Sequence, residues 1–318
     1  MNQITKLAFT FPGQGSQSVG MGKDLADAFV SARSIFEEID DALSQNLSRL
    51  MWEGPMEDLT LTANTQPALM ACSLAVMRVL SQDFDVDVSA ASYVAGHSLG
   101  EYSALCAAGS LSLAETAKLL RLRGEAMQKA VPVGEGAMAA LLGADLDVAD
   151  KAVTVGAKFG VCQIANDNAN GQVVISGAKV AVDAAIEAAN ELGVRKAVLL
   201  PVSAPFHCEL MSPAGEAMAD ALTDANMKTP IVPVVNNVTA GPVSDPAQLK
   251  ADLVSQVTGR VRWRESVTWM AEDGVETFAE PGTGKVLTGM LRRIVKGVNG
   301  VALSTPEALE KFAETLKG

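Results

Sequence analysis

The sequence has few of the residue types that build metal centres, disulfide frameworks and membrane spans. Its 318 residues include four cysteines and two histidines. The cysteines are far apart and form no C-x-x-C pair, so we expect reduced thiols and no metal site. No segment approaches the roughly 20 uninterrupted apolar residues that a membrane helix needs. The first residues do not have the pattern of a secretion signal, and we therefore expect a cytoplasmic protein with no membrane association.

Positive charge is also scarce. The formal net charge is −12, which argues against a nucleic-acid partner because nucleic-acid-binding proteins usually carry a basic surface. An anionic substrate would therefore need a local basic site. Any single surface cation is more often a solvated charge than part of a site. The cations that cluster in the sequence are Arg121 with Arg123, Arg195 with Lys196, and Lys285 with Arg292, Arg293 and Lys296.

Strand-like and helix-like segments alternate along the chain, which predicts an α/β protein with a largely parallel sheet. The length allows one large domain or two unequal ones. Pro67 is placed at the first turn of a helix that continues over residues 68–80. Strands are predicted at 7–11 and 93–95, and further helices at 101–108, 113–130 and 208–225.

The pattern changes between residues 132 and 201. Strands are predicted at 137–142, 161–165, 172–176 and 196–200, with helices at 147–158 and 180–192. Residues 166–171 are predicted to be the loop between the second and third of these strands. The order βαββαβ is that of a ferredoxin-like unit. We therefore expect a small ferredoxin-like domain over 132–201, inserted into a large α/β domain formed by 1–131 and 202–318.

A G-x-S-x-G motif occupies residues 96–100. The bare pattern occurs by chance in roughly one chain in ten of this length, but a predicted strand before it and a helix after it are what a nucleophile elbow requires. The turn needs glycine where backbone segments approach closely. It exposes Ser98 at a helix N-terminus, where the helix dipole favours a developing oxyanion. The alternative is a Gly-Ser turn without a chemical role.

A serine nucleophile needs a base, and the chain offers two histidines. His97 adjoins the serine, so its ring should point away from the serine oxygen and pack or hydrogen bond within the turn. His207 is the remaining candidate, on a proline-containing turn before a helix; a lone histidine is usually structural, but the elbow favours catalysis. No histidine follows it, and no Asp or Glu stands out as a third triad member. A backbone carbonyl could orient the imidazole instead.

Seven motifs in order carry a resemblance to a known family. They are FPGQGSQ at 11–17, TQPA at 65–68, GHSLGEY at 96–102, RLRG at 121–124, APFH at 204–207, PVVNN at 233–237 and PGTGKVL at 281–287. Together they resemble the malonyl-CoA:acyl carrier protein transacylases of bacterial fatty-acid synthesis, over nearly the whole chain. The resemblance implies an α/β-hydrolase-like large domain.

The resemblance also implies transfer of malonyl from malonyl-CoA to the phosphopantetheine thiol of acyl carrier protein, without a cofactor. Arg123 would hold the malonyl carboxylate, which suits a guanidinium because it grips a carboxylate with two parallel hydrogen bonds. Phe206 would leave room for malonyl and crowd a branched acyl group. The remaining implied roles are Ser98 as nucleophile, His207 as base and then acid, the N–H groups of Gln14 and Leu99 as oxyanion hole, and the carbonyl of Gln256 as the group that orients His207.

Carriers in this family are small acidic proteins. We therefore assign Arg195, Lys196, Lys285, Arg292 and Arg293 to docking of the carrier or coenzyme A. Two alternatives remain. A serine hydrolase, such as a thioesterase, would use the same Ser98 and His207 but pass the acyl group to water, and a non-catalytic carrier-binding protein would keep a vestigial elbow.

Two glycine-rich segments imitate nucleotide-binding motifs. Residues 13–18 begin like a dinucleotide fingerprint but lack its third glycine in register. Residues 279–286 lack both the first glycine and the Ser/Thr of a P-loop. Neither a nicotinamide cofactor nor nucleoside triphosphate hydrolysis is expected.

Overall fold

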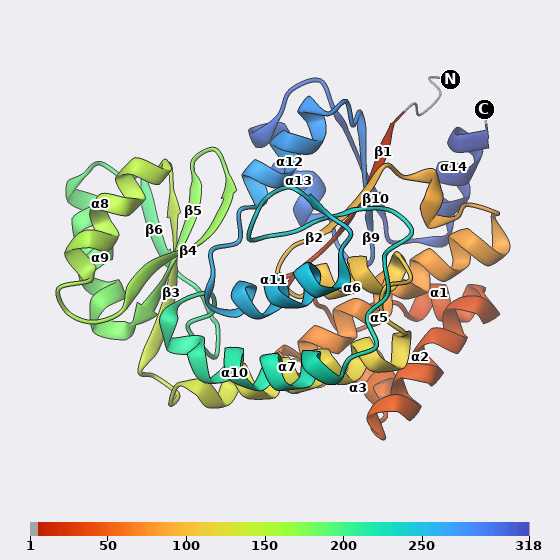
Figure 1. Ribbon diagram of the computed structural model, residues 1–318, viewed down its shortest axis with the longest axis horizontal. Helices are drawn as coiled ribbons and strands as arrows, with labels where there is room; N and C mark the ends of the chain where they lie inside the picture. The colour runs from red at the N-terminus through yellow and green to blue at the C-terminus, as the bar shows by residue number, and fades with distance from the viewer. Residues whose placement is uncertain (1–5, 318) are drawn as a thin grey trace.

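A computed structural model, which describes residues 6–317, shows an α/β protein built on two separate sheets (Figure 1). The larger sheet has the strand order β10-β9-β1-β2-β7-β8. Its pairs are parallel, except that β7 and β8 run antiparallel at one edge. The strands are β1 (Leu7–Phe11), β2 (Tyr93–Gly96), β7 (Val234–Val235), β8 (Pro242–Val243), β9 (Thr277–Pro281) and β10 (Asn299–Leu303). The predicted parallel sheet is confirmed.

Alternate residues of the central strands serve two different cores, because successive side chains of a strand point to opposite faces. Leu7, Phe9 and Phe11 belong to the cluster that includes α5 (Thr62–Asp83). Ala8 belongs to a second cluster on the other face, with residues of α12 (Trp263–Glu272) and α13 (Val286–Ile294). Helices therefore cover both faces of the sheet, as a parallel sheet requires.

Helix α5 is buried almost all round, between the sheet and the helices α2 (Val30–Leu43) and α7 (Leu113–Ala130). The prediction that this helix begins at Pro67 is wrong. It begins at Thr62, where Asn64 and Thr65 donate to the Leu61 carbonyl. Proline interrupts a helix ladder because it has no N–H, but here packing on all sides holds the helix across it.

The remaining helices surround this core. They are α1 (Lys23–Ala28), α3 (Leu47–Glu53), α4 (Met56–Thr60), α6 (Gly100–Ala107), α10 (Ser212–Asp224), α11 (Pro246–Thr258) and α14 (Pro306–Lys317). The helix predicted from residue 208 opens with a 3₁₀ turn at Glu209–Met211, and α10 follows it. Within residues 6–317, no helix is long and apolar enough to cross a membrane.

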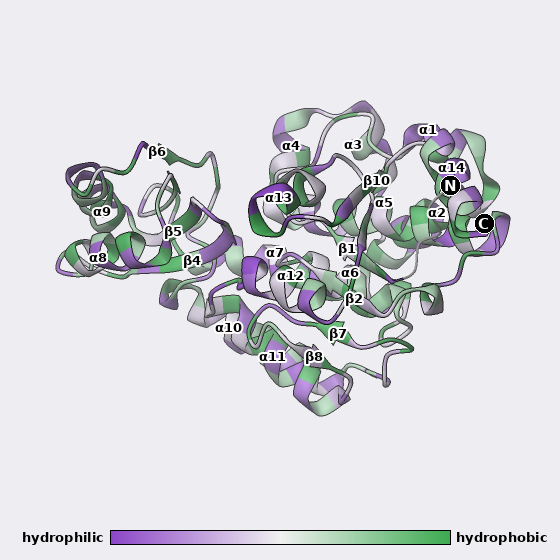
Figure 2. Cartoon of the chain, turned by 90° about the horizontal axis from the view of Figure 1, so that it is seen from above, coloured by the Kyte–Doolittle hydropathy of each residue, from purple (hydrophilic) through white to green (hydrophobic). Residues whose placement is uncertain are grey.

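The smaller sheet is antiparallel, with the order β4-β5-β3-β6. It consists of β3 (Gly136–Leu142), β4 (Cys162–Ala169), β5 (Gln172–Ala178) and β6 (Lys196–Leu199). Two helices pack on it, α8 (Leu146–Gly156) and α9 (Lys179–Glu191). Figure 2 shows this unit on one side of the larger one. The predicted βαββαβ order and ferredoxin-like fold are confirmed.

The loop predicted at residues 166–171 is wrong, because β4 continues to Ala169 and the chain reverses at Asn170 and Gly171. The register of β4 against β5 shifts twice in this stretch. The backbone is held from outside the small sheet: Asp167 N–H donates to the Val261 carbonyl at 2.9 Å, and the Asp167 carboxylate pairs with Arg264 at 2.8 Å. These contacts outweigh the local turn preference of the Asn-Asp-Asn run.

Candidate active site

The serine motif has the geometry of a nucleophile elbow between β2 and α6. Ser98 has φ 52°, in the left-handed region. A Cβ on Gly96 would lie 1.9 Å from the Gly100 carbonyl carbon, and one on Gly100 would lie 2.3 Å from the Phe11 carbonyl oxygen. Side chains at these two positions are therefore excluded by backbone, which explains the glycines on either side of the serine.

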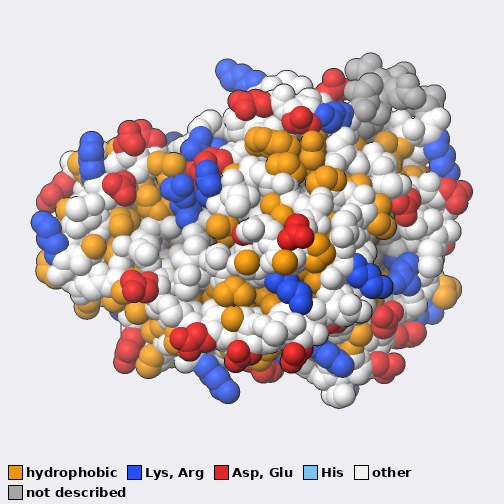
Figure 3. Space-filling view, viewed as in Figure 1, with side chains coloured by type: hydrophobic (Ala, Val, Ile, Leu, Met, Phe, Trp, Pro, Cys, Tyr) orange, Lys and Arg blue, Asp and Glu red, His pale blue; other side chains and the backbone are white. Residues whose placement is uncertain are grey.

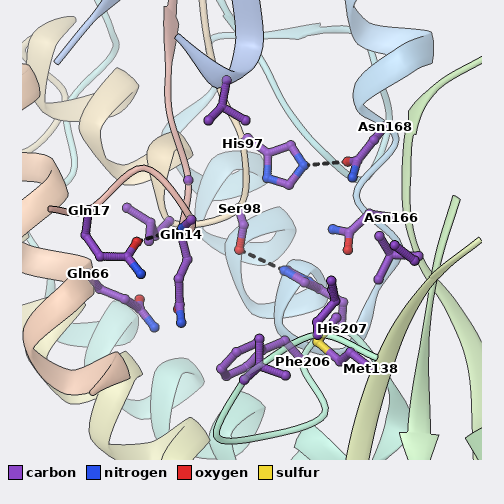
Figure 4. A pocket seen from close by; sticks show the side chains of 18 of the residues that line it. Gln14, Gln17, Gln66, His97, Ser98, Met138, Asn166, Asn168, Phe206 and His207 are labelled. Atoms are coloured by element: carbon purple, nitrogen blue, oxygen red, sulfur yellow. Dashed lines mark hydrogen bonds between the residues drawn. The ribbon is translucent and has the colours of Figure 1, made fainter. Parts of the chain in front are cut away.

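Ser98 and His207 lie in hydrogen-bonding contact (Figure 4). The Ser98 Oγ is 2.7 Å from His207 Nε2, and His207 Nδ1 is 2.9 Å from the Gln256 carbonyl oxygen. Because that carbonyl can only accept, Nδ1 carries the proton and Nε2 is free to accept from the serine. Burial and the nearby Arg123 charge lower the pKa of His207 to about 3, so the ring is neutral at physiological pH.

Asn237, just beyond β7, holds the elbow on both sides of the serine. Its Oδ1 accepts from the Ser98 N–H at 2.7 Å, and its Nδ2 donates to the Gly96 carbonyl at 2.7 Å. The side chain is fully buried, so both bonds are shielded from water. Asn237 thus stabilises the left-handed backbone that presents Ser98.

Arg123 is brought from α7 to the serine and is almost completely buried. Its guanidinium donates to Gln66 Oε1 at 2.8 Å, to Gln256 Oε1 at 2.9 Å and to Ser98 Oγ at 3.2 Å. All three acceptors are neutral, so the positive charge has no directly bonded carboxylate in this set. A buried cation in this state is suited to an anionic ligand.

A cavity of about 330 Å³ opens above Ser98 and His207. One wall is the face of the small sheet that carries Met138, Ala140 and Val174, and another is α13. Gln14 and Leu99 also line it, and Figure 4 places Gln14 beside Ser98. A Cβ on Gly13 would lie 2.7 Å from the His97 carbonyl oxygen, so the loop after β1 rests directly on the elbow.

Comparison with known proteins agrees with this geometry. A sequence profile described as "Acyl transferase domain" matches residues 8–305. The malonyl CoA-acyl carrier protein transacylase of Bacillus subtilis (strain 168) is 44% identical, over 99% of this chain and 98% of its own length. A solved acyl-carrier-protein S-malonyltransferase from Bartonella henselae is 55% identical, with a TM-score of 0.96 over 99% of this chain and 100% of that one.

The chain belongs to the malonyl CoA-acyl carrier protein transacylase family. Another solved member is a malonyl-transacylase in complex with its type II PKS acyl-carrier protein. It is 41% identical, with a TM-score of 0.94, over 98% of this chain and 99% of that chain.

The histidine beside the nucleophile was expected to pack or hydrogen bond within the turn, and it instead makes its side-chain hydrogen bond to the small sheet. His97 Nε2 lies 2.8 Å from Asn168 Oδ1 of β4, and the ring stands edge-on to Trp263 (Figure 4). The ring points away from the serine oxygen, as expected. The sequence pattern did not single out Asn168, because its nearness to the elbow depends on β4 reaching across to the large sheet.

The five cations predicted to dock the carrier lie on or beside β6 of the small sheet and α13 of the larger unit. Arg195 precedes β6 and Lys196 is its first residue, Lys285 precedes α13, and Arg292 and Arg293 lie in the last turn of α13. Arg293 donates to Gln172 Oε1 at 2.6 Å, next to the β4–β5 hairpin. Figure 3 shows Lys and Arg side chains gathered where the small sheet meets the region of α13.

Arg195 lies at the same end of the small sheet as that hairpin. The N–H of Gly143 donates to the Gly171 carbonyl in the hairpin, and a Cβ on Gly143 would lie 3.2 Å from the Arg195 Cβ. The described cations from β6 and from α13 therefore flank one end of the small sheet. Lys285 lies apart from them, at the other end of α13.

Proposed function

We propose that this protein transfers a malonyl group from malonyl-CoA to the phosphopantetheine thiol of an acyl carrier protein, through a malonyl ester on Ser98, and so supplies fatty-acid chain elongation. The observation that carries the proposal is the chain of contacts from Arg123 through Ser98 and His207 to the Gln256 carbonyl. It joins a nucleophile, a base and a cation within one cavity. Relatives that match this chain over nearly their whole length are named malonyl CoA-acyl carrier protein transacylase.

In the first half-reaction, His207 Nε2 takes the Ser98 proton while Oγ attacks the thioester carbonyl. The N–H groups of Gln14 and Leu99 stabilise the oxyanion, a role supported by their position on the cavity wall beside Ser98. When the C–S bond breaks, His207 returns the proton to the leaving thiolate. The Gln256 carbonyl keeps the imidazole in the required tautomer.

The second half-reaction runs through the same groups. The carrier thiol gives its proton to His207, its sulfur attacks the malonyl ester, and Ser98 leaves with the proton. Arg123 holds the malonyl carboxylate throughout, because its buried guanidinium can exchange a neutral acceptor for an ionised one. The route consumes no redox equivalent, and we propose that it needs no cofactor. Among residues 6–317 there is no group of three or more His, Cys, Asp or Glu that could hold a metal ion.

The alternative function, a thioesterase, would share the first half-reaction and let water attack the ester. Mass spectrometry after mixing the protein with malonyl-CoA tests the proposal. We expect a malonyl adduct on Ser98, absent in Ser98→Ala, which persists until carrier is added. Rapid release of free malonate without carrier would identify a thioesterase, and no adduct would indicate a binding protein with a vestigial elbow.

We also propose that residues 132–201 form the small domain and residues 1–131 with 202–318 the large one, which is supported by the two sheets and the separate core of the small one. Carrier docking would use Arg195, Lys196, Arg292 and Arg293 at the end of the small sheet, and Lys285 at the opposite end of α13. A cytoplasmic location is part of the same proposal, and subcellular fractionation would test it.

A further inference from the structure

Glu101 is a fully buried acid directly behind the nucleophile. It is the second residue of α6 and has no exposed surface. Its Oε2 accepts from the Asn237 N–H at 2.9 Å and from Gln256 Nε2 at 3.0 Å. Its Oε1 has no hydrogen-bond partner within residues 6–317. Burying an ionised carboxylate costs free energy unless a positive charge or several hydrogen-bond donors stabilise it. The groups around Glu101 therefore show which charge stabilises it.

The Gln256 amide links Glu101 to Arg123. Gln256 Nε2 donates to Glu101 Oε2, while Gln256 Oε1 accepts from the Arg123 guanidinium at 2.9 Å. The Glu101 carboxyl group and the Arg123 guanidinium are thus separated by a single amide group, that of Gln256. Since the acceptors bonded to Arg123 are neutral, Glu101 is the carboxylate to which its charge is connected.

The charges facing Glu101 have opposite effects. Burial is the largest effect and raises the pKa of Glu101, the two donors lower it, Asp252 of α11 raises it and Arg123 of α7 lowers it; the net result is a pKa of about 7. The neighbouring Tyr102 phenol stays neutral, because burial raises its pKa well above physiological pH. The ionisation of Glu101 is therefore sensitive to any new charge at Arg123.

We propose that Glu101 is a positioning residue and the counter-charge of Arg123 through Gln256, and that it takes up one proton when a substrate carboxylate binds Arg123. The proposal rests on the proposed function, because it requires the malonyl carboxylate on the guanidinium. Two carboxylates close to one buried cation do not both stay ionised. The substrate carboxylate bonds the cation directly, so Glu101 accepts a proton from solvent at Oε1 and no bond of the substrate changes. An acetyl group brings no charge and leaves Glu101 as it was.

The test is the pH dependence of one ratio, kcat/KM for malonyl-CoA over that for acetyl-CoA. Both substrates carry coenzyme A, and both react at Ser98 with His207 as base. The ionisations of these groups therefore cancel in the ratio. In the native enzyme the ratio should be level at low pH and fall above neutrality, approaching about tenfold per pH unit. In Glu101→Gln, which keeps an oxygen acceptor but cannot ionise, the ratio should stay level.

Glu280→Gln is the matched control. Glu280 is as completely buried and accepts from the N–H groups of Leu287 and Thr288, away from this network. It should keep the native fall of the ratio. A native ratio that is level with pH, or a fall that persists unchanged in Glu101→Gln, would overturn the proposal, because a purely structural glutamate affects both substrates equally.

A second measurement needs no variant. Native enzyme mixed with malonyl-CoA in weak buffer at slightly alkaline pH should take up roughly one proton more per acylated serine than with acetyl-CoA. Equal proton counts would overturn the proposal even if Glu101→Gln does not fold. If Ser98 gains no malonyl group, or Arg123→Ala leaves the substrate ratio unchanged, the proposed function itself fails instead.

Discussion

At the scale of single residues, we propose that Arg123 determines which acyl group the site prefers. Its guanidinium is buried and bonded to neutral acceptors, so an acetyl group leaves it without an anion and a malonyl group supplies one. We expect Arg123→Ala to lower kcat/KM for malonyl-CoA by about 100-fold or more and to affect acetyl-CoA less. Arg123→Lys should restore only part of the preference, because an ammonium lacks the forked geometry.

Arg121 is the matched control for this prediction. It lies two residues away on α7, where it bonds Asn64 and Gln45 instead of the serine. Arg121→Ala should leave the malonyl-to-acetyl ratio of kcat/KM at its native value. Equal losses for both substrates in Arg123→Ala would show that this arginine is structural and that the carboxylate is recognised elsewhere.

The lowered pKa of His207 predicts an unusual dependence of activity on pH on the acid side of neutrality. An unperturbed histidine base would lose activity as the pH falls through about 6.5. Burial and Arg123 lower the pKa of His207 to about 3, so the base stays unprotonated well below that pH. We expect kcat/KM for acetyl-CoA to show no decline centred near pH 6.5. Assaying at neutral pH after incubation at each acid pH would distinguish titration from denaturation. A reversible loss of activity centred near pH 6.5 would contradict this prediction.

At the scale of elements, the elbow depends on a side chain from the turn that follows the neighbouring strand β7. Asn237→Ala removes the acceptor for Ser98 N–H and the donor for the Gly96 carbonyl, so we expect stability to fall by roughly 1–3 kcal/mol per unsatisfied buried group and kcat to fall with it. Asn237→Asp keeps the acceptor and should lose less kcat. Asn226, which is exposed, is the control. Asn226→Ala should change neither the free energy of unfolding, measured with a chemical denaturant, nor kcat. A stable Asn237→Ala with native kcat would remove Asn237 from the site.

The two elements that flank the end of the small sheet predict how carrier binds. Arg293→Glu, in the last turn of α13, should raise KM for an acidic carrier and weaken its dependence on salt, because it removes a local attraction. Arg49→Glu is the control, since that exposed arginine lies on α3 and pairs with Glu53. Steady-state assays with carrier at two ionic strengths measure both effects. A KM that Arg293→Glu leaves unchanged would place docking elsewhere.

The elements show what the sequence could predict and where local reasoning failed. Helix α7 and strand β1 were predicted with their observed bounds, since Pro132 with Gly134 after the helix and an apolar run ended by Pro12-Gly13 are local signals. The extension of β4 through Asn166 was missed because it depends on Val261, far away in the chain. The same holds within the site. Motifs singled out Ser98 and His207, whereas the contacts of Asn237 and Gln66, which also lie in motifs, and those of Asn168 depend on the fold.

At the scale of the whole molecule, the two histidines make stability depend on pH. Burial lowers the pKa of both His97 and His207 in the folded protein, while the unfolded chain titrates near 6.5. Below that pH the unfolded state binds more protons, so stability is lost as the pH falls, by up to about 1.4 kcal/mol per pH unit for each histidine. Glu101 has the opposite sign: its raised pKa favours the fold at low pH, and that contribution is lost as the pH rises through about 7.

Comparing the native protein with one variant separates the contribution of His207 to the pH dependence of stability from that of Glu101 and the other acids. The free energy of unfolding of native protein and of His207→Gln should be measured at pH 7.5 and pH 5.5. The native protein should lose more than the variant over this interval, by about 1.4 kcal/mol, because the variant has no imidazole to protonate on unfolding. Identical losses would mean that His207 is charged or solvated in the fold.

The alternation of side chains along β3 and β5 separates two kinds of mutational effect. Ala139, Leu141 and Ile175 face α8 and α9, whereas Met138, Ala140 and Val174 line the cavity. Neighbouring positions on one strand therefore meet different physical constraints: one packs in the core of the small sheet and the next lines the cavity. An acyltransferase with this fold can change the width of its pocket by substitution at every second residue while the core of the small sheet stays intact. Pocket shape is thereby free to diverge without loss of the fold.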